Sequence, residues 1–435
     1  MLNRFSYSLL FYLLLPLVML RLLYRAWRAP AYARRWRERF GWFDASCLQG
    51  KAVIWVHSVS VGESIAAAPL VRGLQQQYPG HQLVVTTMTP TGSERVKAIY
   101  GESVFHVYAP YDLPGSVARF LRRTRPQLAI IMETELWPNT VAACHGQNIP
   151  VLLANARLSE RSARGYGRFP ALVGPMLQAL SGIAAQSEEA AARFRSLGVE
   201  AARVWVTGSL KFDLPVDASV RQQGVELRKQ WLQQQANGTR VVVAASTHQG
   251  EDEQVLSAVA QLETPPLLVL VPRHPERFSS VAELLEKRGL VFARRSLGQQ
   301  VVGDTRVVLA DTMGEMLAFL GAADVAFIGG SLVPTGGHNM LEASALGVPV
   351  VSGPHLFNFK EISDQLLAAG AMLVVNDAAE LSVKLGVLLG DEPERQRMGA
   401  AGIEVVEKNK GALQRQLEIS GRLLEGQRPP FDDYS

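Results

Sequence analysis

Short apolar runs alternate with helical stretches along most of this chain, and the series starts twice. Buried parallel strands read as continuous apolar runs, and a crossover helix must separate each strand from the next. The pattern therefore predicts an α/β fold with two doubly wound parallel sheets. The expected strands of the first series are 52–57, 82–88, 104–109, 128–132, 151–155, 182–186 and 204–207. Those of the second are 240–245, 267–271, 307–310, 325–328, 348–352 and 372–375.

A polar stretch at 213–238 separates the two series. We therefore predict two Rossmann-like domains that face each other across a cleft, with a boundary near 210–220. No GxGxxG follows the first strand of either series, which argues against a dinucleotide cofactor. The predicted division is 1–43 for an N-terminal anchor, 44–212 for the first domain, and 213–435 for the second domain with a closing helix at 391–427.

Residues 1–43 hold eight arginines and one glutamate, whereas the rest of the chain holds 36 basic and 39 acidic residues. The net charge of +4 therefore belongs to the N-terminal segment, and a nucleic acid is not an expected partner. Cys47 and Cys144 lie too far apart in the sequence for a disulfide framework or a zinc site, which fits a reducing compartment.

The run Phe5–Leu20 is apolar and uncharged, although its 16 residues fall short of the roughly 20 that span a membrane. Seven arginines follow the run and one precedes it, so a spanning helix would leave the protein body in the cytoplasm. Alternatively the helix lies in the interface, with Trp27, Trp36 and Trp42 at the headgroups. Both interpretations predict the cytoplasmic face of the inner membrane and anionic lipids as partners.

The stretch 327–353 reads as strand, glycine loop, helix and strand. The glycines of Thr335-Gly336-Gly337 let the backbone approach a ligand closely. We expect a helix from 338–342 to about Leu346, whose free N–H groups and dipole suit a phosphate. Glu342, one turn into that helix, is placed to accept hydrogen bonds from two ribose hydroxyls. An ordinary turn without a ligand is the alternative.

In the first domain, Glu63 follows the first strand, where ligands bind in open α/β sheets. It is a candidate general base. However, Ser60 and Glu63 also fit a capping box, in which the glutamate only satisfies a backbone N–H. A helix start also favours the ionised carboxylate and would lower its basicity.

Glu133 and Glu135 end an apolar strand, and strand alternation would point them to one side. They are candidates to bind a metal, a cationic partner or the acceptor hydroxyls. Lys211, near the domain boundary, is placed to reach an anionic group, or is simply solvated. In the second domain, Arg273 suits a phosphate or carboxylate. We expect another helix to begin at 312–315, where it offers further backbone N–H groups.

Six segments, in the order HSVSVGES, METELWPN, SLKFD, VPRHPER, MGEM and GGSLVPTGGHNMLE, resemble those of the 3-deoxy-D-manno-octulosonic acid (Kdo) transferases of lipopolysaccharide synthesis. The anchor also matches, so the resemblance covers nearly the whole chain. One departure is Ala343, where many such transferases have a proline after the glutamate; this changes the helix slightly and should leave Glu342 in place.

The resemblance implies a GT-B fold, CMP-Kdo as donor, a lipid A precursor (lipid IVA) as acceptor, and no metal or other cofactor. It implies Glu63 as the base of an inverting transfer, with Glu133 and Lys211 stabilising the transition state. The implied donor contacts are Pro272, Arg273, Met313, Gly314, Glu315, Asn339, Met340, Leu341 and Glu342. Further donor or acceptor contacts are expected at Ser60, Gly62, Glu135, His274, Ser331, Gly336, Gly337 and His338.

Two other functions stay open. One is another sugar-nucleotide enzyme of the same fold, such as a UDP-sugar lipid transferase or an epimerase, which would require uridine. The other is a membrane-surface scaffold without catalysis, which would bind no nucleotide.

Overall fold

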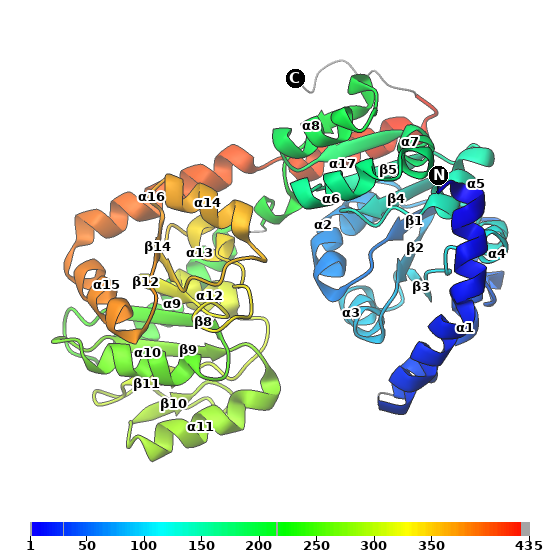
Figure 1. Cartoon of the computed structure of the whole chain (residues 1–435). Coiled ribbons are helices and arrows are strands. Elements are labelled where there is room, and N and C mark those ends of the chain that lie inside the picture. The colour runs from blue at the N-terminus through cyan, green and yellow to red at the C-terminus, as the bar shows by residue number, and fades with distance from the viewer. Residues whose placement is uncertain (1, 29, 215, 428–435) are drawn as a thin grey trace. The chain divides into compact units, whose positions relative to one another are not determined.

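The computed structural model describes residues 2–28, 30–214 and 216–427, and the chain divides into two compact units (Figure 1). The first unit comprises Met1–Asp213 and Lys410–Ser435, and the second comprises Leu214–Asn409. Within the described residues, each unit contains one seven-stranded sheet whose paired strands are parallel. The predicted α/β class, with a doubly wound sheet in each half of the chain, is confirmed.

The first sheet has the strand order β3-β2-β1-β4-β5-β6-β7. The order reverses at β1, which pairs with β2 on one side and β4 on the other. Ligands of open α/β sheets bind at the carboxyl ends of strands beside such a reversal. The strands are β1 (Ala52–His57), β2 (His81–Thr87), β3 (Phe105–Tyr108), β4 (Leu128–Met132), β5 (Val151–Ala156), β6 (Gly182–Ala185) and β7 (Val204–Val206).

Helices connect these strands and cover both faces of the sheet. They are α1 (Arg4–Arg28), α2 (Val61–Gln77), α3 (Pro90–Tyr100), α4 (Pro114–Thr124), α5 (Pro138–Gly146), α6 (Glu160–Gly167), α7 (Pro170–Gln178), α8 (Glu188–Ser196) and α17 (Ala412–Leu424). Short 3-10 helices are η1 (Pro30–Ala33), η2 (Trp36–Phe40), η3 (Ser46–Leu48), η4 (Ala201–Arg203) and η5 (Leu210–Phe212).

The second sheet has the order β10-β11-β9-β8-β12-β13-β14. Its strands are β8 (Val241–Thr247), β9 (Leu267–Pro272), β10 (Phe292–Arg294), β11 (Val307–Leu309), β12 (Val325–Ile328), β13 (Val350–Ser352) and β14 (Met372–Val374). Its helices are α9 (Ala218–Leu232), α10 (Glu251–Ala260), α11 (Phe278–Lys287), α12 (Met316–Gly321), α13 (Leu341–Ala345), α14 (Lys360–Ala368), α15 (Ala378–Gly390), α16 (Glu392–Asn409) and the 3-10 turn η6 (Pro275–Arg277). The strand β10 was not predicted, because three residues at a sheet edge leave no apolar run to detect.

The closing helix expected at 391–427 is two helices, separated at Gly411, whose φ of 90° interrupts the helical conformation. The second of them, α17, belongs to the first unit, whereas the sequence-based division placed it with the second domain. Leu417 and Ile419 of α17 lie in the core cluster under β1 and β4. Gly73 of α2 allows this approach, because a Cβ there would stand 2.7 Å from the Leu417 side chain.

The helix α1 is longer than the run seen in the sequence, at 25 residues, because it continues through Arg21 and Arg25 to Arg28. Its length and composition would allow it to cross a membrane, and only 6% of its apolar 18-residue stretch is buried. This helix fits a membrane anchor.

Gln416 tests the attachment of α17. Its Oε1 accepts from the N–H of Asn155 at 3.1 Å, and its Nε2 donates to Thr207 Oγ1 at 3.2 Å, in a fully buried site. Gln416→Ala leaves that N–H buried without an acceptor, so we expect β5 to lose about 1–3 kcal/mol of opening free energy, measured by hydrogen exchange. Gln414→Ala, at an exposed position of α17, is the control. Equal exchange in both variants would contradict the attachment.

Candidate functional site

Three glutamates gather at the carboxyl edge of the first sheet. Glu63 follows β1, Glu133 and Glu135 follow β4, and Arg157 follows β5. Because β1, β4 and β5 are neighbours in the sheet, their loops emerge side by side. Their charges are close enough to interact. The charges of Glu133 and Arg157 shift the pKa of Glu63, and those of Glu63 and Glu133 shift the pKa of Glu135. The structure therefore brings Glu63 together with the pair Glu133 and Glu135, which the sequence offered as a separate candidate.

Glu63 is half-buried at the start of α2, and its carboxylate takes part in helix capping. Its Oε2 accepts from the N–H of Val59 at 2.7 Å, and its Oε1 accepts from Ser60 Oγ at 3.0 Å. Ser60 Oγ in turn accepts from the N–H of Glu63 at 3.3 Å. This is close to a capping box, except that the carboxylate bonds one residue before the cap. A carboxylate has about four acceptor positions, so these two bonds leave room for a substrate hydroxyl.

The basicity of Glu63 is higher than the sequence analysis expected. Burial raises the pKa of Glu63 above its ordinary value, and the hydrogen bonds from Val59 and Ser60 offset only part of that rise. Glu133 raises the pKa further, whereas Arg157 lowers it. The expectation that the helix start would lower the basicity was therefore wrong, because desolvation of the carboxylate outweighs the hydrogen bonds that it accepts there.

Glu133 lies in the turn after β4 with a φ of 56°, in the left-handed region that costs a non-glycine residue free energy. Its Oε2 is 3.3 Å from Arg157 Nε. Because β4 ends at Met132, the expectation that strand alternation orients both glutamates was wrong. Glu133 and Glu135 lie close together because the chain turns after β4, where the N–H of Glu135 donates to the carbonyl of Met132 at 3.3 Å.

Glu135 has a strongly perturbed carboxyl. Burial raises its pKa to about 7, and the charges of Glu63 and Glu133 contribute to the rise. The site therefore exchanges a proton close to neutral pH, which suits general acid or base chemistry.

Lys211 is half-buried in η5, which contacts α2, the helix that carries Glu63. Asn155 fixes this turn: its Oδ1 accepts from the N–H of Leu210 at 3.0 Å. Asn155 itself has a left-handed φ of 49° at a register shift of β5. The end of β5 and the turn after β7 are thus held together at the edge of the sheet where the three glutamates lie.

In the second unit, Arg273 directly follows β9, and Glu342 lies in α13, the helix after the loop that follows β12. The N–H of Arg273 donates to the carbonyl of Thr247 at 3.0 Å, which ties the turns after β8 and β9 together. Glu342 is half-buried, and burial raises its pKa, whereas a hydrogen bond from Asn339 Nδ2 at 3.0 Å and the charge of Arg273 lower it. A carboxylate and a guanidinium therefore share this edge, as the sequence analysis expected of the second domain.

Three histidines lie near Arg273. His248 and His338 have parallel rings 5.0 Å apart, and their Nε2 atoms are 2.7 Å apart, so one must donate and the other accept. His274 meets His248 edge to face at 5.3 Å. Burial lowers the pKa of His338 to about 3, and nearby Arg273 contributes, so His338 is neutral at physiological pH.

The glycine loop differs from its prediction in two ways. The helix expected from 338–342 to Leu346 begins only at Leu341, as the short helix α13, because Asn339 Oδ1 caps the N–H of Leu341 at 3.2 Å. Glu342 therefore lies in the first turn. Gly336 and Gly337 do have left-handed φ values of 104° and 78°, but the close approach at Gly336 is made by Asn358 and Phe357 of the same chain.

The residue that holds this loop was missed in the sequence. Glu251, fully buried at the start of α10, accepts from the N–H groups of Gly330, Ser331 and Leu332 at 2.7–2.9 Å. It also accepts from the N–H of His248 at 2.9 Å. Acidic residues are common in a first helical turn, so the sequence carries no signal of this role.

The other predicted donor contacts vary in exposure. Ser331 is buried, and its Oγ donates to the carbonyl of Ile328 and accepts from the N–H of Gly353, so it serves the loop itself. Pro272, Met340 and Leu341 are buried, and any ligand contact from the latter two would go through the backbone.

Met313, Gly314 and Glu315 precede α12, where a helix was expected. Met313 is exposed, and Gly314 has a left-handed φ of 89°. The Glu315 carboxylate pairs with Arg295 at 2.7 Å, and that guanidinium holds the pKa of Glu315 below its ordinary value. Glu315 is therefore an ionised acceptor at this turn.

Two solved structures resemble this chain over most of its length. A putative UDP-N-acetylglucosamine 2-epimerase from Listeria monocytogenes has a TM-score of 0.56 and 16% identity, covering 89% of this chain and 100% of that one. A glycosyltransferase from Rickettsia africae has a TM-score of 0.55 and 13% identity, covering 87% and 100%. At such identities the likeness shows the fold alone, which is the GT-B fold.

Sequence relatives are more specific. A family model described as 3-deoxy-D-manno-octulosonic-acid transferase (kdotransferase) matches residues 34–214. The 3-deoxy-D-manno-octulosonic acid transferase of Haemophilus influenzae is 45% identical over 427 residues, covering 97% of this chain and 99% of the relative. The enzyme of that name from Bordetella pertussis is 38% identical over 379 residues, covering 84% and 86%. The chain therefore belongs to the 3-deoxy-D-manno-octulosonic acid transferases, a family of glycosyltransferases.

Proposed function

We propose that this transferase moves Kdo from CMP-Kdo to a lipid A precursor, lipid IVA, without a metal ion and with Glu63 as the general base. The observation that carries the proposal is the acid cluster at the end of β1 and β4, in a chain of this family. Glu63 there is partly desolvated, keeps free acceptor capacity, and has a raised pKa. A base is most effective when its pKa lies near the working pH.

The reaction is a single displacement with inversion. A hydroxyl of the acceptor attacks the anomeric carbon of Kdo, the bond from that carbon to the CMP phosphate breaks, and Glu63 takes the hydroxyl proton. The transition state resembles an oxocarbenium ion, as in other glycosyl chemistry. Glu133 and Lys211 stabilise the charges that develop: the carboxylate favours the cationic sugar, and the ammonium favours an anion.

Residues of the second unit bind the donor. Arg273 offers a planar fork to the CMP phosphate or to the Kdo carboxylate. Glu342 accepts hydrogen bonds from the ribose hydroxyls, and its pairing with Asn339 holds the carboxylate in place. The backbone around Gly314 and Asn339 supplies further contacts. The neutral His338 allows a hydrogen bond to the sugar or base without adding charge.

The chemistry of the donor explains why a cation is unnecessary. CMP-Kdo carries one phosphate between sugar and nucleoside, so there is no pyrophosphate for a divalent ion to bridge. A guanidinium and an ammonium are sufficient to stabilise a departing phosphate of this charge. This reasoning favours metal-independent transfer.

The acceptor explains the position of the protein in the cell. A lipid A precursor lies in the membrane and carries phosphates, so an enzyme that uses it gains from an apolar helix with arginines at its ends. The exposed leucines of α1 and the arginines that flank them support attachment to the cytoplasmic face of the inner membrane, with anionic lipids as partners.

Mass spectrometry of the product lipid tests the proposal. Full-length protein is incubated with CMP-Kdo and lipid IVA, with and without EDTA, and we expect lipid IVA carrying one or more Kdo residues in both reactions. UDP-N-acetylglucosamine replaces the donor in a parallel reaction and should give no product. Absence of product with folded protein would refute the proposed transfer, and loss of product with EDTA would refute metal independence alone.

Glu63→Gln tests the base. The amide keeps an acceptor for the N–H of Val59, so the start of α2 should remain folded, but it cannot take a proton. We expect kcat to fall about 10²- to 10⁴-fold, with binding of CMP measured by calorimetry unchanged. Glu102→Gln, at an exposed position of the first unit, is the matched control. A near-normal rate would mean that Glu63 serves only as a helix cap.

The pH dependence of kcat/KM tests the electrostatics of the cluster. Glu63 acts when ionised, so the rate should fall as the pH drops through its raised pKa. Arg157 lowers that pKa, so Arg157→Gln should move the acid limb to higher pH. Arg161→Gln, which removes an exposed charge from α6, should leave the limb in place. An acid limb that stays put or moves to lower pH in Arg157→Gln would contradict the assignment.

A further inference from the structure

The first turns of α1 are hydrogen-bonded to the globular part of the first unit. The Tyr7 hydroxyl donates to the Asp112 carboxylate. The single Ser8 hydroxyl proton is shared between Asn139 Oδ1 at 3.0 Å and the carbonyl of Arg4 at 2.8 Å. Asp112 is 3% exposed and also accepts from the N–H groups of Asn139 and Thr140 at 2.9 and 2.8 Å. The carboxylate that receives Tyr7 is therefore a rigid, buried group that caps α5.

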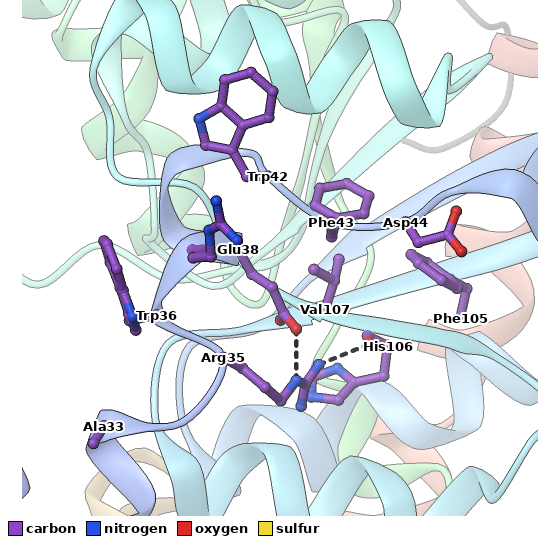
Figure 2. Close-up of a pocket in the computed structure, with 11 residues that line it drawn as sticks. Ala33, Arg35, Trp36, Glu38, Trp42, Phe43, Asp44, Phe105, His106 and Val107 are labelled. Atoms are coloured by element: carbon purple, nitrogen blue, oxygen red, sulfur yellow. Dashed lines mark hydrogen bonds and ion pairs between the residues drawn. The ribbon is translucent and has the colours of Figure 1, made fainter.

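The C-terminal end of the segment 1–43 contacts the first unit near the residues that hold the start of α1. Arg39 in η2 is buried, its guanidinium stacks 4.3 Å from the ring centroid of Tyr108, and its carbonyl accepts from the N–H of Tyr111 at 2.7 Å. Figure 2 shows Arg35 bound to Glu38 and to the carbonyl of His106, beside a hollow of about 510 Å³. Both ends of the segment are thus attached near 106–112.

These attachments conflict with a helix that crosses the bilayer. From Tyr7 to Arg28 the helix rises roughly 32 Å, about the thickness of the hydrocarbon core. If α1 crossed with the first unit on the side of Arg28, Tyr7 would lie a bilayer away from Asp112. If the unit lay on the side of Tyr7, the chain between Arg28 and Arg39 would have to recross the hydrocarbon. That connection holds three arginines and short 3-10 turns, which a bilayer core does not accept.

The exposure along α1 has the period of a helix lying on a surface. One row of side chains is half-buried over the length of the helix: Tyr7, Phe11, Leu15, Val18, Leu22 and Ala26. The opposite row is exposed and apolar: Phe5, Leu9, Leu13, Leu17, Leu20 and Trp27. Arginines stand exposed at both ends, Arg4 at one and Arg21, Arg25 and Arg28 at the other. In Figure 1, α1 runs beside α5, which it contacts.

We propose that α1 does not span the membrane but is clamped along the first unit by Tyr7–Asp112 and Ser8–Asn139, and that it lies in one leaflet. The exposed apolar row enters the boundary between headgroups and acyl chains, and the arginines at both ends contact anionic headgroups. Arginine at each end is the arrangement expected when both ends meet the same charged surface. The partner of this face is an anionic phospholipid leaflet. The inference rests on the anchor alone and is independent of the catalytic assignments.

Thiol labelling in sealed inverted inner-membrane vesicles tests the topology. Cys47 is exposed on the first unit and reports its side of the membrane, whereas Cys144 is buried. A second protein carries Asn3→Cys and Cys47→Ser. We expect a membrane-impermeant maleimide to label the two proteins equally, with no gain after detergent. If position 3 and Cys47 require opposite conditions for labelling, α1 spans the bilayer and the proposal is overturned.

Tyr7→Phe tests the clamp without removing the ring. In protein bound to vesicles of phosphatidylethanolamine and phosphatidylglycerol, the amides of residues 4–12 should exchange about tenfold faster, because a hydrogen bond to a charged acceptor is lost. Tyr12→Phe, at an exposed position of the same helix, should leave exchange unchanged. Unchanged exchange in Tyr7→Phe would show that the hydroxyl does not hold the helix. Activity is not needed for either measurement, so failure of the proposed transfer would leave both results interpretable.

Discussion

The parallel register of β1, β4 and β5 is the constraint on which the candidate site depends. It delivers Glu63, Glu133 and Arg157 to one edge from segments far apart in the sequence. Burial raises the pKa of Glu63 and of Glu135, the like charges nearby add to the rise, and Arg157 offsets only part of it at Glu63. The fold thus creates the electrostatic conditions for proton transfer, and the left-handed turn at Glu133 is a local strain that the buried strand before it can sustain.

Carboxylates in this chain divide into two groups by what surrounds them. Glu251 and Asp112 are buried, but each accepts several N–H groups, so each acts as a fixed structural acceptor for a loop or a helix start. Glu135 is also partly buried, but its pKa rises to about 7, because burial desolvates the carboxyl and the charges of Glu63 and Glu133 lie nearby. Burial raises the pKa of Asp112 too, so what distinguishes it from Glu135 is that several donors fix the position of its carboxylate.

The buried strands were predictable because apolar runs between helices have few alternative folds, and β10 was not, because three residues at an edge leave no such run. The site residues at strand ends followed from the same logic. The environments of these residues could not be predicted. The raised pKa of Glu63 arises from its burial in the folded chain, and α13 starts late because the side chain of Asn339 binds the N–H of Leu341. Glu251 and the return of α17 to the first unit depend on contacts between residues remote in the sequence, for which one chain gives no pattern.

The clamp on α1 and the acid cluster are joined through α5. Asp112 receives Tyr7 and also caps the first turn of α5, and the segment directly before that turn carries Glu133 and Glu135. A helix resting in one leaflet and bonded to this carboxylate would therefore fix the distance between the lipid surface and the acids. An acceptor that keeps its acyl chains in the bilayer presents its hydroxyl at a height set by its headgroup. A spanning helix on a free linker would leave that height variable, whereas a clamped one makes it a property of the fold.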